Sequence, residues 1–312
     1  MNKSYEQQNP IFIVGMPRSG TTLIRTLLSA HPHITISPET HFIKNWFKPY
    51  RHLDLNQPEQ WENFWQALSY SEIFKSLGLD TGKTQANLLA LDNINHKNVF
   101  TVLLQSYARK MQKQRWGEKT PDHYQYLDIL FRWYPDAKVI WMLRDPRAVS
   151  ASLITKKWAS SYIDVHARKW FYSMEKFTQI WSKDRRILLV KYESLVRKPE
   201  LEMSRICNFL QEDYSSLIIS ENQKSPSILG LKSIIDESVQ EVLNPVHQTA
   251  LEKWKTNLSA YQIGVVEHFT RNEMLEQGYK PITNKLSRLQ SLQLFLILNL
   301  RKLKNNMKNM RI

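Results

Sequence analysis

Apolar residues recur along this chain in two spacings: short continuous runs, and longer stripes in which every third or fourth residue is apolar. Four continuous runs have the length and bounding residues of buried strands: residues 11–14, 34–36, 138–143 and 187–191. The stripes have the period of amphipathic helices, for example Trp61, Phe64, Trp65 and Leu68. Strands that alternate with helices predict right-handed crossovers. We therefore expect a three-layer α/β fold with a mainly parallel central sheet flanked by helices.

A glycine-bounded loop follows the first predicted strand. Residues 15–22 read Gly-Met-Pro-Arg-Ser-Gly-Thr-Thr and lead into an apolar helix. Gly15 and Gly20 permit backbone turns that aim N–H groups inward, and the helix start adds the positive end of its dipole. The glycine spacing matches the nucleotide-triphosphate loop, but Thr21 occupies the lysine position and Arg18 is the cation inside the loop. The loop therefore predicts an oxyanion site in which the transferred group is not phosphoryl.

A second strand-to-helix corner follows residues 138–143. Arg144 leaves the carboxyl end of this strand, which is where open α/β sheets bind ligands. Ser152 lies two turns into the following helix, with its hydroxyl facing back toward the corner. The pair predicts a second phosphate site. A solvated ion pair of Arg144 with Asp145 at the helix start is the alternative.

The two corners together resemble the sulfotransferases that use 3′-phosphoadenylyl sulfate (PAPS). The family's 5′-phosphosulfate loop commonly reads PRSGTT, which is the sequence of residues 17–22, and its 3′-phosphate site has an arginine with a serine eight positions later. The resemblance implies a P-loop-type fold and PAPS as cosubstrate, without a metal. It implies these nucleotide contacts: Arg18, Ser19, Gly20, Thr21, Thr22, Leu23, Arg144 and Ser152.

Two further charged residues are candidates for the transfer chemistry, together with Arg18. Glu39 follows the short run 34–36 and is a candidate general base, and we expect aromatic neighbours such as Phe42 to raise its pKa. Lys119 precedes a helix start and is suited to neutralise charge on the leaving oxygen. Both positions resemble those used by protein-tyrosine sulfotransferases. Without that resemblance, Glu39 is equally a first-turn helix residue and Lys119 a surface lysine.

The resemblance to the protein-tyrosine branch extends to four further positions. The family's tyrosine that faces the adenine corresponds to Tyr192, which ends the run at 187–191. Ser238 and Lys253 match nucleotide contacts of that branch, and Lys156 stands where the branch has an arginine. The resemblance therefore implies that these residues contact PAPS as well.

The segment 44–115 matches no family pattern and is predicted to be a helical insertion. Its aromatic residues between positions 46 and 74 either form a core or line an acceptor pocket. The identity of the acceptor depends on this segment, so a peptide tyrosine, a sugar, a lipid and another small alcohol all remain open. Oligomeric state is equally open.

Composition is that of a large globular domain. The chain has 312 residues, of which 42% are hydrophobic and 23% charged, which suffices for one continuous core over residues 1–282. The single cysteine, Cys207, excludes a disulfide framework and a cysteine-rich metal site, and its place in an apolar helix predicts burial. The first residues lack the pattern of a signal peptide. We therefore expect a cytoplasmic enzyme.

The segment 283–312 differs from the rest because it is basic and amphipathic. It carries seven basic residues and no acidic one, and so supplies half of the formal net charge of +14. Its apolar positions follow a helical period: Leu289, Leu292, Leu296, Leu300, Leu303, Met307 and Met310. The helix is expected to be buried against the body of the enzyme, a second subunit in a homodimer, or an anionic membrane surface contacted peripherally.

Two other function classes are compatible with parts of this sequence. The basic charge alone would suit an anion-binding or nucleic-acid-binding module, although the chain has no recognised nucleic-acid motif and we expect no nucleic-acid partner. A small-molecule kinase with a degenerate phosphate loop would use Asp145 to hold magnesium. A metal requirement would distinguish that kinase from a sulfotransferase.

Overall fold

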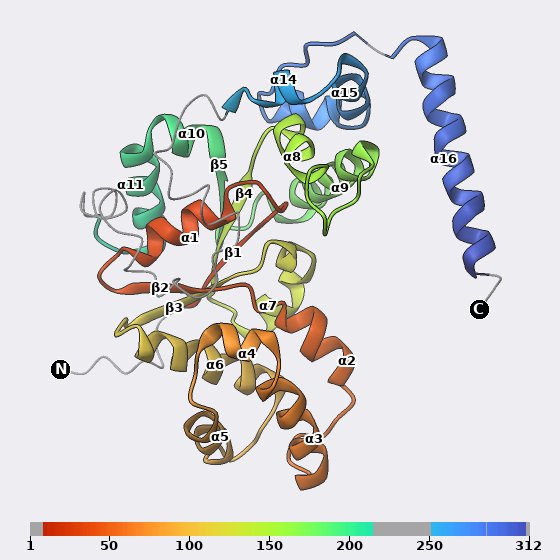
Figure 1. The fold of residues 1–312 in the computed structure, drawn as a ribbon. Helices are drawn as coiled ribbons and strands as arrows, with labels where there is room; N and C mark the ends of the chain where they lie inside the picture. The colour runs from red at the N-terminus through yellow and green to blue at the C-terminus, as the bar shows by residue number, and fades with distance from the viewer. Residues whose placement is uncertain (1–8, 215–250, 285, 310–312) are drawn as a thin grey trace. The chain divides into compact units, whose positions relative to one another are not determined.

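The computed structural model of the protein describes residues 9–214, 251–284 and 286–309, with side chains up to Arg301 (Figure 1). Their contacts divide into two compact units. Among the described residues, the first consists of residues 9–144 and 180–214, and the second of residues 145–179, 251–284 and 286–309. Each unit is described by itself.

The first unit is built on a parallel sheet of five strands among the described residues, in the order β2-β3-β1-β4-β5. The strands are β1 (Ile11–Gly15), β2 (Ile34–Ser37), β3 (Arg115–Lys119), β4 (Lys138–Leu143) and β5 (Ile187–Lys191). The predicted mainly parallel α/β sheet is thus confirmed. Strand β3 was not expected, since its sequence Arg-Trp-Gly-Glu-Lys has no apolar run; it forms because β1 and β2 pair with its backbone on both sides.

Helices cover this sheet and form the insertion between β2 and β3. The insertion consists of helices, which lie together in the lower part of Figure 1. Its elements are the π-helical turn Ile43–Phe47, α2 (Lys48–Tyr50), α3 (Pro58–Ser69), α4 (Glu72–Leu77), α5 (Thr81–Leu89) and α6 (His96–Lys110). The other helical elements of this unit are α1 (Thr21–Ser29), the 3-10 helix Pro121–Tyr126, α7 (Leu127–Trp133), α10 (Tyr192–Arg197) and α11 (Pro199–Leu210). Cys207 of α11 is fully buried, as its apolar helix predicted.

Most aromatic residues of the insertion form its core, whereas Tyr70 is exposed. The predicted stripe of α3 is buried throughout, with Trp61 stacked on Trp65 at a ring separation of 5.6 Å. Trp65 in turn contacts the ring of Phe74 in α4 edge-on. Phe100 of α6 stacks on Phe12 of β1, which fixes the insertion against the sheet. The tryptophans of α3 therefore pack in the interior of the insertion and are not exposed on its surface.

The second unit is helical in its described residues. It contains α8 (Pro146–Leu153), α9 (Ile163–Lys176), α14 (Trp254–Asn257), α15 (Ala260–Glu276) and α16 (Arg288–Asn309), with a π-helical segment, Phe177–Trp181, after α9. The buried guanidinium of Arg147 pairs with Asp145 and with Glu267, both at 2.7 Å, and lies 4.0 Å from the ring centre of Trp254. A fully paired buried charge of this kind fixes α8 against α14 and α15.

In the part of the chain that the structure describes, no helix has both the length and the apolar character needed to cross a bilayer.

Candidate active site

Five of the expected site residues lie at one edge of the sheet. Because all five strands are parallel, their carboxyl ends meet at the same edge. The register sets Ile13 beside Lys119 and Gly15 beside Met142. One site residue follows or ends each strand: Arg18 after β1, Glu39 after β2, Lys119 at the end of β3, Arg144 after β4 and Tyr192 after β5.

The loop after β1 has the shape of an anion site. Arg18 and Gly20 both have positive φ, 71° and 90°, which turns the backbone tightly before α1. The first turn of α1 holds no acidic residue, so its N–H groups and its positive dipole end are not compensated by a side chain. The hydroxyl of Ser19 is buried and has no hydrogen-bond partner among the described residues. A buried polar atom without a partner is costly, and an oxyanion would satisfy it.

Gly20 is required by its surroundings as well as by its φ. A Cβ built at this position would overlap Cδ2 of the Tyr192 ring. Tyr192 thus packs directly on the loop, at the start of α10.

Replacing Gly20 with alanine is expected to destabilise the fold by about 1–3 kcal/mol, the cost of holding a residue with a side chain in a strained backbone conformation. Chemical denaturation measures it. Gly82→Ala in α5 is the matched control, because its added Cβ meets only the Asp80 carboxylate, at 3.7 Å, and should be neutral or slightly stabilising. Equal stabilities of the two variants would show that Gly20 is not under this constraint.

Arg144 supports the same loop. Its guanidinium lies 4.2 Å from the centre of the Tyr192 ring, and its Nη1 donates a hydrogen bond to the carbonyl oxygen of Arg18 at 3.0 Å. The arginine expected to bind a phosphate thus also ties the loop after β1 to the end of β4.

Glu39 and Lys119 contact each other directly. The Lys119 ammonium donates a hydrogen bond to Oε1 of Glu39, and His41 lies 3.2 Å from Oε2. Lys119 also lies 3.5 Å from the hydroxyl of Thr22 in the first turn of α1. Lys119 is buried, while the Glu39 side chain is 39% exposed. The acid, the cation and the loop helix therefore share one site.

The pKa of Glu39 differs from the expectation. Burial alone would raise the pKa, but the charges and hydrogen bonds of Lys119 and His41 outweigh burial and lower the pKa to about 2. The expectation of a raised pKa considered only aromatic shielding. Hydrogen bonding to Glu39 raises the pKa of His41 in turn.

A buried network beneath this pair was missed at the sequence level. The carboxylate of Glu118 accepts hydrogen bonds from the backbone and hydroxyl of Thr40, from the hydroxyl of Thr120 and from His123 at 3.0 Å. Thr40 follows Glu39 and Thr120 follows Lys119, so Glu118 holds together the two segments that carry the pair. The sequence carried no signal for it, because the strand that buries Glu118 has no apolar run.

The remaining expected site residues lie in the loop helix α1, in the second unit or outside the described residues. Thr21, Thr22 and Leu23 form the first turn of α1. In the second unit, Ser152 lies in the last turn of α8, Lys156 in the turn that follows, and Lys253 just before α14. Ser238 lies outside the described residues.

A sequence profile of the sulfotransferase family matches residues 10–216 of this chain. The chain belongs to the sulfotransferase family. This sulfotransferase is 30% identical over 291 residues to protein-tyrosine sulfotransferase 2 of Gallus gallus, a match that covers 90% of this chain and 72% of the relative. The resemblance to the protein-tyrosine branch is thus confirmed.

Solved sulfotransferases have the same fold. The sulfotransferase domain of the Synechococcus PCC 7002 olefin synthase superposes with a TM-score of 0.59 at 24% identity, covering 85% of this chain and 96% of that domain. A mouse sulfotransferase solved in complex with PAP superposes with a TM-score of 0.50 at 13% identity, covering 85% of this chain and 84% of the other. The expected three-layer α/β fold is therefore the fold of this family.

The alternative of a magnesium-dependent kinase is not favoured by this family membership. Asp145, its expected magnesium ligand, instead binds Arg147 through both carboxylate oxygens, at 3.0 Å and 2.7 Å. A nucleic-acid-binding module is equally not favoured.

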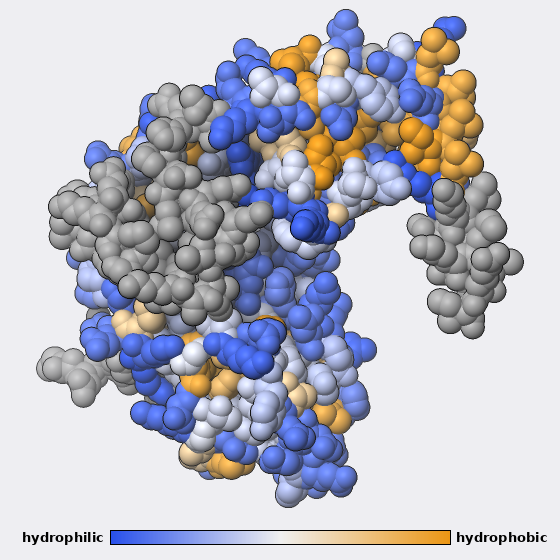
Figure 2. Space-filling model, in the orientation of Figure 1, coloured by the Kyte–Doolittle hydropathy of each residue, from blue (hydrophilic) through white to orange (hydrophobic). Residues whose placement is uncertain are grey.

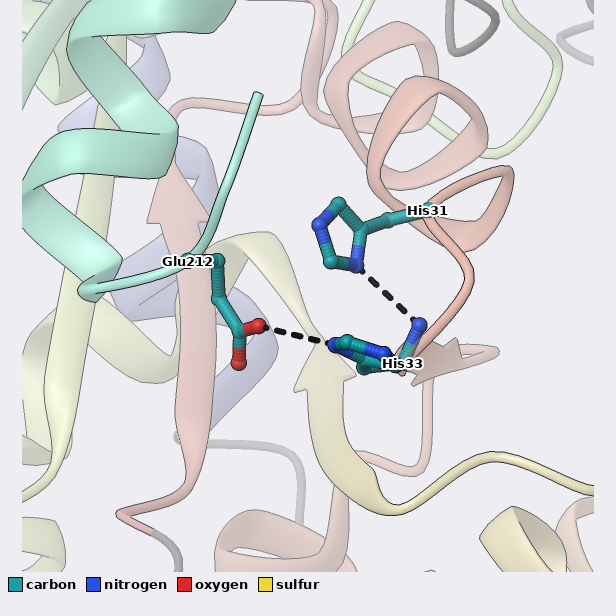
Figure 3. A group of neighbouring side chains, drawn as sticks. All are labelled: His31, His33 and Glu212. Atoms are coloured by element: carbon teal, nitrogen blue, oxygen red, sulfur yellow. Dashed lines mark hydrogen bonds and ion pairs between the residues drawn. The ribbon is translucent and has the colours of Figure 1, made fainter. Parts of the chain in front are cut away.

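A second polar cluster of this sulfotransferase lies away from the pair (Figure 3). His31 accepts a hydrogen bond at Nδ1 from the backbone N–H of His33, and its Nε2 donates to the carbonyl oxygen of Asp213. His33 contacts Glu212, whose other carboxylate oxygen pairs with Arg115 at 3.0 Å. Because both ring nitrogens of His31 are engaged by backbone groups, the cluster fits a structural contact between the α1–β2 turn and the end of α11.

Proposed function

We propose that this sulfotransferase transfers the sulfuryl group of PAPS to the hydroxyl of a peptide tyrosine. The observation that carries the proposal is the contact between Glu39 and Lys119 beside the loop that precedes α1. The peptide acceptor is supported by the identity to the protein-tyrosine sulfotransferase of Gallus gallus. A sugar, a lipid and another small alcohol are the competing acceptors.

The loop residues fit the donor. The N–H groups of Ser19 to Leu23 would bind the 5′-phosphosulfate, and the buried hydroxyl of Ser19 would gain its missing partner. Arg144 and Ser152 would bind the 3′-phosphate, and Tyr192 would face the adenine. Three further residues would contact the nucleotide: Lys156, Ser238 and Lys253.

The proposed reaction is an in-line displacement at sulfur. The tyrosine oxygen attacks the sulfur, the bond from sulfur to the 5′-phosphate oxygen breaks, and Glu39 accepts the phenolic proton. Lys119 and Arg18 neutralise the negative charge that develops on the leaving phosphate. The sulfonate needs no divalent cation to offset its charge, so we propose a metal-independent enzyme.

The ion pair between Glu39 and Lys119 would also control the base. While Lys119 is bound to Glu39, the carboxylate is ionised but a poor proton acceptor, because its pKa is about 2. A bound phosphosulfate competes for the Lys119 ammonium. As that contact weakens, the pKa of Glu39 rises and the carboxylate becomes a better base for the acceptor.

The 3′-phosphate site is tested with two variants. Arg144→Ala and Ser152→Ala are each expected to weaken PAP binding by about 1.5–3 kcal/mol, because each removes a hydrogen bond to a charged group. Isothermal titration calorimetry measures the affinity, with the exposed Arg132→Ala as control. Unchanged PAP affinity in both variants would contradict the assignment.

The donor and the acceptor are tested separately. PAP but not ADP should raise the melting temperature, since a ligand that binds only the folded state stabilises it. Transfer of radiolabelled sulfuryl groups to peptides, phenols and sugars then identifies the acceptor, and EDTA should leave the rate unchanged. A requirement for ATP and magnesium would reject sulfuryl transfer, while label on sugars alone would reject the peptide acceptor.

We also propose a cytoplasmic location. The support is that the one cysteine, Cys207, is buried and that burial raises its pKa to about 11, so the fold uses no oxidised or reactive thiol. Cell fractionation tests it, and recovery of the protein in secretory compartments would reject it. The C-terminal helix could serve a homodimer or a peripheral membrane contact, and vesicle sedimentation of the full chain distinguishes the two.

A further inference from the structure

Helix α16 packs against the other helices of the second unit by one side only. Leu294 is buried in a cluster that includes Ala167 of α9 and Val266 of α15, and Leu298 packs against the same cluster. One turn further, Arg301 forms an ion pair of 2.6 Å with the buried Asp164 of α9. The helix is therefore anchored to α9 and α15 by a face that its apolar period did not indicate.

The part of the predicted apolar stripe whose side chains are described lies on the other side of α16; Leu303, Met307 and Met310 fall outside the described side chains. Leu289, Leu292, Leu296 and Leu300 are between 52% and 79% exposed. With about 100° of rotation per residue, these leucines point nearly opposite to Leu294 and Leu298. Figure 2 shows apolar side chains along the described part of this helix, at the right of the view. We refer to the four leucines as the outer stripe.

The charge around the outer stripe has one sign. Residues 283–312 contain seven basic residues and no acidic one, and five of the basic residues follow Leu300. An apolar stripe on a helix whose charges are all positive is typical of helices that lie in the surface of an anionic bilayer.

We propose that the outer stripe inserts into the surface of an anionic phospholipid membrane. The basic residues of the segment 283–312 would contact the headgroups, except Arg301, which is paired with Asp164. A second copy of the chain fits less well, because each α16 would meet another helix with the same positive charge and no acidic residue. Four leucines in a single row also form a small surface for a stable dimer. The anchored face of α16 holds the enzyme body to the membrane surface.

Vesicle sedimentation of the full chain tests the proposal. Binding is expected to vesicles of equal parts phosphatidylcholine and phosphatidylglycerol, and much weaker binding to phosphatidylcholine alone. Replacing the outer stripe by serine (Leu289, Leu292, Leu296 and Leu300) should lower partitioning about a hundredfold, since partial burial of four leucines is lost. Partitioning should also fall in the combined variant Lys302→Gln, Lys304→Gln and Lys308→Gln, by about fivefold per charge removed. Added salt should likewise weaken the binding of the unaltered protein to anionic vesicles.

The control is Leu201→Ser with Leu275→Ser, two leucines that are 62% and 55% exposed on α11 and α15. This control should partition as the unaltered protein does. The lysine variant alters no apolar residue and keeps the test decisive if the serine variant unfolds. Equal sedimentation with both kinds of vesicle, or unchanged binding of the serine and lysine variants, would overturn the proposal. The proposal would also be overturned if the unaltered protein bound no vesicles and instead formed a dimer that the serine variant does not form.

Discussion

Glu39→Gln should lower kcat by about 10²- to 10⁴-fold while PAP affinity changes little, because the amide cannot accept the acceptor's proton. The substitution keeps the shape of the side chain and removes only its charge. Single-turnover transfer to the acceptor identified by the labelling experiment measures kcat, and calorimetry measures the PAP affinity.

Glu62→Gln is the matched control for this variant, since Glu62 is exposed on α3 in the same unit. It should retain the full rate. A Glu39→Gln enzyme that turns over at the rate of this control would assign the base to another group. Weaker PAP binding with an unaltered rate would instead make Glu39 a residue that positions Lys119.

Lys119→Met should lower kcat by about 10²- to 10³-fold, the loss that follows removal of a fixed group that stabilises developing charge. The methionine fills the buried volume without the ammonium. This variant also changes the pH dependence in a defined direction. Lys119 lowers the pKa of Glu39 in the free enzyme, so without Lys119 that pKa rises from about 2.

The acid limb of kcat/KM reports the pKa of the free enzyme, so it should move to higher pH in Lys119→Met. At mildly acidic pH a smaller fraction of Glu39 is then ionised, and the variant loses more activity there than at neutral pH. The exposed Lys44→Met is the control for loss of charge alone. An acid limb at the same pH in Lys119→Met and in the control would show that Glu39 is not the titrating base.

The membership in the sulfotransferase family could be predicted because its signal is local. The loop from Gly15 to Thr22 depends on two glycines at fixed spacing and on the strand and helix beside them. The positive φ of Gly20 and the start of α1 are decided within a few residues. Geometry that depends only on neighbouring residues can be predicted from the sequence alone.

The contact that carries the proposed chemistry could not be predicted in the same way. Glu39 and Lys119 are 80 residues apart in the chain, and they meet because β2 pairs with the unexpected strand β3. The contact with Lys119 helps to lower the pKa of Glu39. The predicted direction of the pKa shift was therefore wrong, because that prediction considered only the neighbouring aromatic residues. The Glu118 network likewise joins two segments that are far apart in sequence.

The sequence by itself determined the alternating strands and helices, the glycine-bounded loop after β1, the burial of Cys207 and a C-terminal helix. Each of these depends on the spacing of residue types within one element. The tertiary structure alone decided the place of β3, the pairing of Glu39 with Lys119 and the face by which α16 docks. These depend on partners from distant elements, whose burial and charge are set only when the chain is folded.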